Sequence, residues 1–95
     1  MSYKLYDLNE TVEMMNSSDY KERFKAEYYQ LKTRYEKLKA FNNRIEAAEQ
    51  CCYVKSTVEM PKHDTPFNIL RDQQHTMGNY LHILEVRAVI ENIDL

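Results

Sequence analysis

Apolar side chains recur at alternating steps of four and three along residues 18–50. The positions of this seam are Phe24, Tyr28, Leu31, Tyr35, Leu38 and Ile45, and Asn42 is its one polar interruption. A strand would alternate at every second residue, so the spacing predicts a long amphipathic helix with Ser18 as its N-cap. Such a helix spans on the order of 48 Å, and its narrow apolar seam requires a partner helix.

A second seam follows Pro66. Thr65 as N-cap and Pro66 at the first helical position predict a helix over residues 66–92. Its seam consists of Leu70, Met77, Leu81, Leu84 and Ala88, with Gln74 as the polar member. We expect the two long helices to pack as an antiparallel hairpin.

The last helix is apolar on more than one side. The residues that lie off its seam are Tyr80, Ile83, Val86, Val89, Ile90 and Ile93. A helix that is apolar on several sides must be buried on several sides. We therefore expect two further partners for it, a second copy of the chain and a short N-terminal helix.

The spacing of Asp7 and Glu10 is that of a capping box and predicts a short helix over residues 8–15. Its apolar face consists of Leu8, Val12 and Met15. Two turns are not stable alone, so this helix must dock on the hairpin. Residues 51–65 form a long connection whose β-branched and aromatic content is compatible with a small ribbon or an ordered loop.

The composition agrees with an all-α fold in a single domain. The chain has 95 residues, one glycine and two prolines, and a chain of this length buries only a modest core. We therefore predict a short N-terminal helix and a long antiparallel hairpin, assembled as a homo-oligomeric helical bundle.

Charge and hydropathy narrow the partners. The net charge is −2, although residues 20–44 carry eight basic residues against three acidic ones. This balance disfavours bulk duplex DNA but suits a small anion. No apolar run is long enough to cross a membrane and no signal peptide is recognisable, so we expect a cytoplasmic protein. Cys51 and Cys52 are expected to be free thiols.

Catalytic and metal-binding motifs are not recognisable in the sequence. His75, His82 and Glu85 share one helical face, but their spacing is that of neither a zinc protease nor a di-iron bundle. A pairing of His63 with a cysteine of the connection is a weak candidate for nucleophilic catalysis. We expect no enzyme activity, no metal and no cofactor.

Aromatic and basic residues alternate in the first long helix, in the run KAEYYQLKTRYEKLK. Tyrosine can stack on a base, and lysine or arginine can bind a phosphate. The candidate ligand-binding residues are Lys25, Tyr29, Lys32 and Arg34 from this helix and Arg71, His75 and Asn79 from the last one. The alternative is a solvated charged face with ion pairs such as Glu22–Lys25 or Glu36–Lys39.

Gly78 lies in the middle of the last helix, where glycine costs about 1 kcal/mol relative to alanine. It indicates either a close helix crossing or the approach of a ligand to the backbone.

Two blocks of the sequence carry a resemblance. They are DYKERFKAEYYQLKTRYEKLKAF and LRDQQHTMGNYLHILEVRAVIENIDL, the second with Leu70, Gln73, Met77, Tyr80, Leu84 and Arg87 at the characteristic positions. They resemble a family of small helical-hairpin proteins of bacteriophages, with relatives catalogued in crAss-like phages. By analogy of fold, this resemblance implies a phage sponge that sequesters cyclic nucleotide signals of bacterial immunity.

The leading hypothesis is therefore a phage inhibitor of antiviral immunity that acts in the host cytoplasm. It would form a homo-oligomer and trap a small nucleotide-like signalling ligand, with its binding pockets where protomers meet. The alternatives are a protein-binding inhibitor of a defence effector, similar to an anti-CRISPR protein, and a scaffolding oligomer without a ligand.

Overall fold

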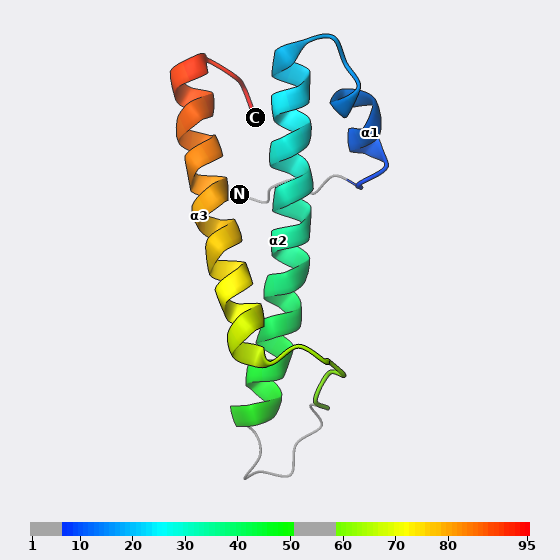
Figure 1. Cartoon of the computed structure of the whole chain (residues 1–95), viewed down its shortest axis with the longest axis vertical. Coiled ribbons are helices and arrows are strands. Elements are labelled where there is room, and N and C mark those ends of the chain that lie inside the picture. The colour runs from blue at the N-terminus through cyan, green and yellow to red at the C-terminus, as the bar shows by residue number, and fades with distance from the viewer. Residues whose placement is uncertain (1–6, 51–58) are drawn as a thin grey trace.

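Three helices make up the described part of the chain, residues 7–50 and 59–95 of a computed structural model. They are α1 (Glu10–Met15), α2 (Tyr20–Gln50) and α3 (Phe67–Glu91), and no strand occurs between or beside them in these residues. The longest dimension is 53 Å, as the length of α2 predicts. Figure 1 shows α3 antiparallel to α2 on one side and α1 on the other. The predicted all-α fold class is confirmed, and a single copy leaves the predicted assembly untested.

The start of α2 differs from the prediction by two residues. Asp19, rather than Ser18, caps the helix, because its Oδ1 accepts a hydrogen bond of 3.0 Å from the backbone N–H of Lys21. The Ser17 hydroxyl in turn accepts a bond of 3.0 Å from the N–H of Asp19. An aspartate at this position satisfies an orphan N–H and also favours the positive end of the helix.

The core lies between α2 and α3. Its buried members are Phe24, Tyr28, Leu81, Leu84, Ala88 and Ile93, and Tyr29, Leu31 and Tyr35 pack against it half-buried. Residue numbers rise along α2 as they fall along α3: Tyr28 Oη donates to Glu85 Oε2 at 2.7 Å, and Gly78 lies against Tyr35. The two predicted seams therefore face each other.

Ile93 corrects one prediction. It was expected to need a second partner, but it is only 6% exposed and belongs to the hairpin core. The helix ends at Glu91, and Asn92 adopts a left-handed conformation with φ 56°. This turn lets the Ile93 N–H donate to the Ala88 carbonyl at 2.8 Å and folds the side chain back onto the core, as in a helix C-terminal cap.

The short helix α1 docks through a different face from the one predicted. Thr11 is fully buried, whereas Val12 and Met15 are about half exposed. Gln30 Nε2 on α2 donates to Thr11 Oγ1 at 2.9 Å, and Thr11 Oγ1 donates to the Leu8 carbonyl at 2.6 Å. A polar contact therefore anchors a helix too short to bury much apolar area.

The position of α1 also corrects the expected environment of α3. Among the described helices, α1 contacts α2 alone, on the side away from α3. The short helix therefore does not cover the outer surface of α3.

A hydrogen-bonded cluster closes the open end of the hairpin. Tyr20 Oη donates to Glu91 Oε1 at 2.7 Å, and Arg87 donates both to Tyr20 Oη at 2.7 Å and to Glu91 Oε2 at 3.1 Å. The bond from Tyr20 lowers the pKa of the Glu91 carboxyl, and the same bond raises the pKa of Tyr20. The Arg87 guanidinium also lies 5.0 Å from the ring centre of Phe24.

The segment that enters α3 lies along α2. His63 Nδ1 is 2.7 Å from the Pro61 carbonyl, and its ring makes an edge contact with Phe41 at 6.2 Å. The helix begins at Phe67 and its N-cap is Pro66, so the prediction of Thr65 as the N-cap is wrong by one residue. The expectations for the two cysteines, and for the part of the 51–65 connection that spans residues 51–58, lie outside the described residues.

Candidate functional site

The two polar interruptions of the seams meet between the helices, toward the end of α2 and the start of α3. Asn42 is 3% exposed, and its Nδ2 donates to the Leu70 carbonyl at 3.2 Å and to Gln74 Oε1 at 2.9 Å. Asn42 Oδ1 is buried without a hydrogen-bond partner. The antiparallel register explains the meeting, because it places each polar residue at the same height as the other.

Gly78 lies one turn further along α3, directly against the Tyr35 ring. A Cβ at this position would be 3.3 Å from Tyr35 Cε1 and 3.5 Å from Tyr35 Oη. The absence of a side chain at Gly78 therefore leaves room for the tyrosine to lie between the helices. This observation supports the predicted close packing, with a side chain rather than a backbone as the neighbour.

A cavity of about 440 Å³ opens beside this contact. Its lining residues are Tyr35, Arg71, Gln74, His75, Gly78 and Asn79. A smaller hollow of about 240 Å³ adjoins it, shares Arg71 and His75, and adds Asn68 and Asp72. The cavity and the hollow follow α3 from its first turn to its middle, and we call the larger one the Arg71 cavity.

The three candidate residues of α3, Arg71, His75 and Asn79, all line the Arg71 cavity. They are exposed and lie four residues apart, so successive turns of the helix bring them to one side. Tyr35 supplies an aromatic ring from α2, and the amino groups of Lys32 and Lys39 both lie 6.0 Å from the centre of that ring. One face thus combines an aromatic ring with several cationic groups.

The other candidates on α2 are less accessible than predicted. Lys25, Tyr29 and Lys32 are half-buried, and none of them lines the Arg71 cavity. Lys25 pairs with Glu22 at 3.7 Å, as predicted, and Lys32 pairs with Glu36 at 3.2 Å. These carboxylates partly neutralise Lys25 and Lys32. Because Glu36 pairs with Lys32, Lys39 remains an exposed cation beside Tyr35.

Arg34 lines a different cavity, of about 410 Å³. Its other lining residues are Met15, Arg23, Glu27, Gln30, Leu31 and Tyr80. Tyr80 Oη donates a hydrogen bond to the Glu27 carboxylate in this cavity. Arg23 donates to the Ser17 carbonyl at 2.9 Å. Several polar groups of this cavity are therefore already engaged in hydrogen bonds within the protein.

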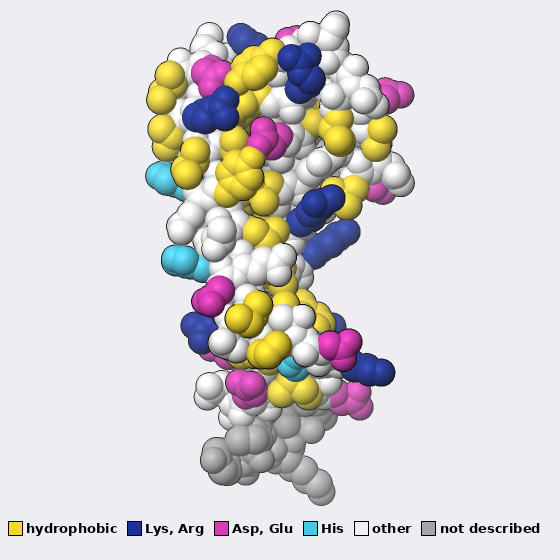
Figure 2. All heavy atoms as spheres, in the orientation of Figure 1, with side chains coloured by type: hydrophobic (Ala, Val, Ile, Leu, Met, Phe, Trp, Pro, Cys, Tyr) yellow, Lys and Arg dark blue, Asp and Glu magenta, His cyan; other side chains and the backbone are white. Residues whose placement is uncertain are grey.

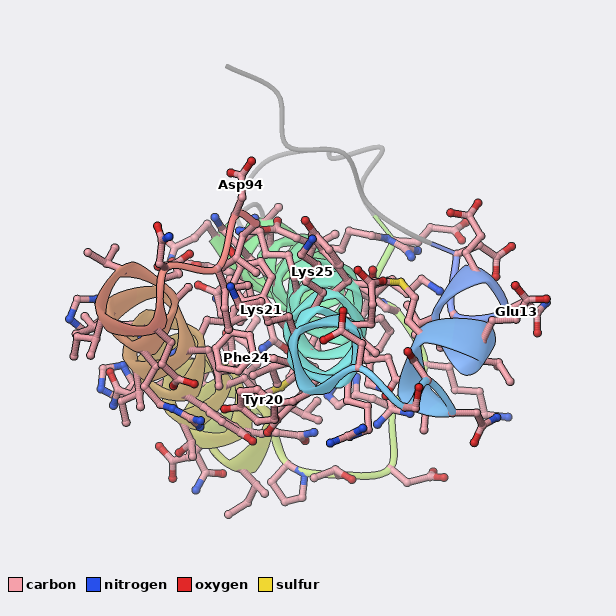
Figure 3. The ribbon with its side chains drawn as sticks, turned by 90° about the horizontal axis from the view of Figure 1, so that it is seen from above. Glu13, Tyr20, Lys21, Phe24, Lys25 and Asp94 are labelled. Carbon is pink, nitrogen blue, oxygen red and sulfur yellow. The ribbon has the colours of Figure 1, made fainter. Side chains whose placement is uncertain are left out.

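The two sides of α2 are visible from the end of the hairpin. Figure 3 shows Phe24 between α2 and α3, with Lys21 and Lys25 on one side of it and Tyr20 on the other. Successive residues of a helix are rotated by about 100°, so Arg34 and its neighbour Tyr35 also point to different sides of α2. Within one protomer, the structure thus does not bring Arg34 together with the candidates of α3.

The Arg71 cavity combines side chains that can contact an anion and an aromatic ring. Arginine forms paired hydrogen bonds with phosphate oxygens, and tyrosine offers a π-face for a base. Histidine and asparagine supply further hydrogen-bonding groups. Sequence analysis missed Gln74 and Tyr35 at this site, because both occupy seam positions; the signal for Gln74 was a polar residue where packing calls for an apolar one.

An exposed apolar stripe continues along α3 beyond the Arg71 cavity. Its members are Ile83, Val86, Val89 and Ile90, which are 56%, 45%, 82% and 76% exposed. Hydrophobic side chains also line the outer edge of the upper half of α3 in Figure 2. Asn79 and Ile83 are one turn apart, so the stripe and the cavity follow each other on the same helix.

Residues 7–50 and 59–95 contain neither a metal-binding cluster nor a membrane-spanning helix. No group of three or more histidine, cysteine, aspartate or glutamate side chains in these ranges is placed to hold a metal ion. None of the helices formed by these residues is both long and apolar enough to span a bilayer.

A family model described as Sequestin matches residues 18–90. The match takes in all of α2 and nearly all of α3, including every residue that lines the Arg71 cavity. No curated protein matches the chain, and no solved structure matches it. The name of the family suggests sequestration of a ligand.

Proposed function

The chain belongs to the Sequestin family, and we propose that it binds and sequesters a nucleotide-derived signalling molecule without cleaving it. In this proposal the protein is a phage-encoded inhibitor of bacterial antiviral immunity and acts in the cytoplasm of the infected host. The observation that supports it is the Arg71 cavity, where a cation, an aromatic ring and amide groups line one opening.

Each part of the cavity has a role in the proposed binding. Arg71 would bind a phosphate through charge-assisted hydrogen bonds, and Lys39 would add positive potential beside Tyr35. Tyr35 is held by Gly78 and by the core, so its ring is positioned for stacking before the ligand arrives. Such preorganisation lowers the conformational-entropy cost of binding.

We also propose that the protein acts as a homo-oligomer. The apolar stripe of α3 is uncovered by any described helix of the same copy, and contiguous exposed apolar surface marks an interaction site. Because the stripe leads into the Arg71 cavity, a second copy on the stripe would stand at the cavity entrance. A pocket shared between copies would enclose a nucleotide more fully than the cavity of one copy.

The test is native mass spectrometry of the protein before and after exposure to extract from cells with an activated defence system. Retention of a mass that matches a nucleotide is the expected result. Arg71→Ala should lower affinity about tenfold or more, because a charge-assisted hydrogen bond contributes roughly 1.5–3 kcal/mol. Arg34→Ala is the matched control, since it removes the same charge from the other cavity.

Release of the captured molecule by heat distinguishes sequestration from cleavage. A molecule that is recovered intact and reactivates the defence system agrees with the proposal, and a shortened molecule contradicts it. A wild-type protein that retains no small molecule, but captures a defence effector, would indicate a protein-binding inhibitor instead.

A further inference from the structure

We propose that Gln74 binds the ligand with its side-chain N–H groups, and that Asn42 is a positioning residue that fixes this orientation. The inference rests on the proposed function and extends it, because it states which chemical group of the ligand faces the floor of the Arg71 cavity. That group is a hydrogen-bond acceptor, either an atom on the edge of a base or a phosphate oxygen.

The argument starts at the backbone of α3. The Leu70 carbonyl can only accept hydrogen bonds, so the Asn42 group that lies 3.2 Å from it must be the donor Nδ2. If the Asn42 amide were rotated by a half turn, two acceptor oxygens would face each other in a buried site. The carbonyl thus determines the orientation of the asparagine.

The orientation of Asn42 determines that of Gln74. The second hydrogen of Asn42 Nδ2 points to the Gln74 amide at 2.9 Å, and the atom that receives it must be the acceptor Oε1. The bond from Asn42 uses Gln74 Oε1, so Gln74 Nε2 and its two hydrogens are not part of this contact. Gln74 Nε2 makes no hydrogen bond within the described residues, and Gln74 lines the Arg71 cavity.

Asn42 is held in this arrangement at a cost. Its Oδ1 is buried and unpaired, and an unpaired buried acceptor destabilises the fold. The arrangement nonetheless uses both hydrogens of Asn42 and leaves Gln74 no choice of orientation. A ligand that meets the cavity therefore encounters fixed donors rather than an amide that could present either end.

Gln74→Glu tests this inference with little change in shape. The new carboxylate still accepts the bond from Asn42, but the oxygen that replaces Nε2 is an acceptor where the amide had a donor. Gln73→Glu is the matched control, because Gln73 is the exposed neighbour and does not line the cavity. Titration calorimetry with ADP, adenosine and inorganic pyrophosphate then compares the two variants with the wild type.

The expected result is a loss of ADP affinity of about tenfold or more in Gln74→Glu, with wild-type affinity in Gln73→Glu. A loss for uncharged adenosine assigns the donor to the base, and a loss confined to pyrophosphate and ADP assigns it to a phosphate. Equal affinities of the two variants for all three probes would overturn the inference and leave the proposed function intact. A wild type that binds none of the probes would also overturn the inference, whereas the proposed function is overturned only if the wild type retains no small molecule from the activated extract.

A second measurement needs no ligand. In amide hydrogen exchange followed by NMR, the side-chain hydrogens of Asn42 should exchange slowly, because they are buried and bonded. Those of Gln74 should exchange fast. Protected Gln74 hydrogens in the free protein would show that another group already uses them and would contradict the inference.

Discussion

At Gly78 the packing of one residue shapes the site around it. The position has no Cβ, and the Tyr35 ring lies so close to it that an added Cβ would be only 3.3 Å from Tyr35 Cε1. Because Tyr35 also lines the Arg71 cavity, the glycine affects the shape of the cavity as well as the stability of the hairpin. A larger residue would have to displace the ring.

We predict that Gly78→Leu lowers the melting temperature, although leucine favours helix formation over glycine by about 1 kcal/mol. Overpacking typically costs about 1–3 kcal/mol, and a Cβ at position 78 would already lie 3.3 Å from Tyr35 Cε1. Thr76→Leu in the exposed surface of α3 is the control and should not destabilise the fold. A higher melting temperature for Gly78→Leu, measured by circular dichroism, would show that the tyrosine moves aside freely.

At the level of elements, the helices are held together by polar contacts at their ends as well as by the seam. The open end of the hairpin has the cluster of Tyr20, Arg87 and Glu91, in which one carboxylate accepts bonds from both other side chains. A carboxylate that accepts hydrogen bonds is favoured in its charged form. The depressed pKa of Glu91 thus links the closure of the hairpin to pH.

The sign of this dependence follows from linkage. Because the pKa of Glu91 is lower in the folded state than its ordinary value of 4.5, its contribution is present above that value and is lost as pH falls through the folded pKa. We predict that Glu91→Gln lowers the melting temperature at pH 7 but not at pH 3. Glu46→Gln, on the exposed surface of α2, should leave the melting temperature little changed at pH 7. A difference between wild type and Glu91→Gln that is the same at both pH values would rule out this contribution.

For the whole molecule, the outer surface of α3 is the feature that one copy does not explain. Val89 and Ile90 are 82% and 76% exposed, and burial of each such side chain is worth roughly 1.5–3 kcal/mol. Since these residues do not contribute to the core of the single copy, a charged replacement should leave the subunit folded.

We predict that Ile90→Glu converts the proposed homo-oligomer to a folded monomer. Ala40→Glu, an exposed apolar-to-acidic change on α2, is the control and should leave the assembly intact. Size-exclusion chromatography with light scattering measures the mass, and circular dichroism measures the helix content. A wild type that is monomeric at micromolar concentration would contradict the proposed assembly.

The sequence by itself determined the secondary structure and the pairing of the long helices. The seams of α2 and α3 have helical periodicity over many turns, and a pattern this long leaves little choice of element or of buried face. Helix ends were less certain by one or two residues, because neighbouring residues such as Ser18 and Asp19 can both act as caps. For α1, too few turns were available to determine the face, and Thr11 docked through a hydrogen bond that no apolar pattern signals.

Tertiary structure alone decided which polar residues share a surface. Periodicity places a residue on one helix, whereas the rotation of α2 against α3 decides what lies opposite it. That rotation put Asn42 against Gln74 and Tyr35 against Gly78, and it brought Arg71, His75 and Asn79 to the Tyr35 side while Arg34 joined another cavity.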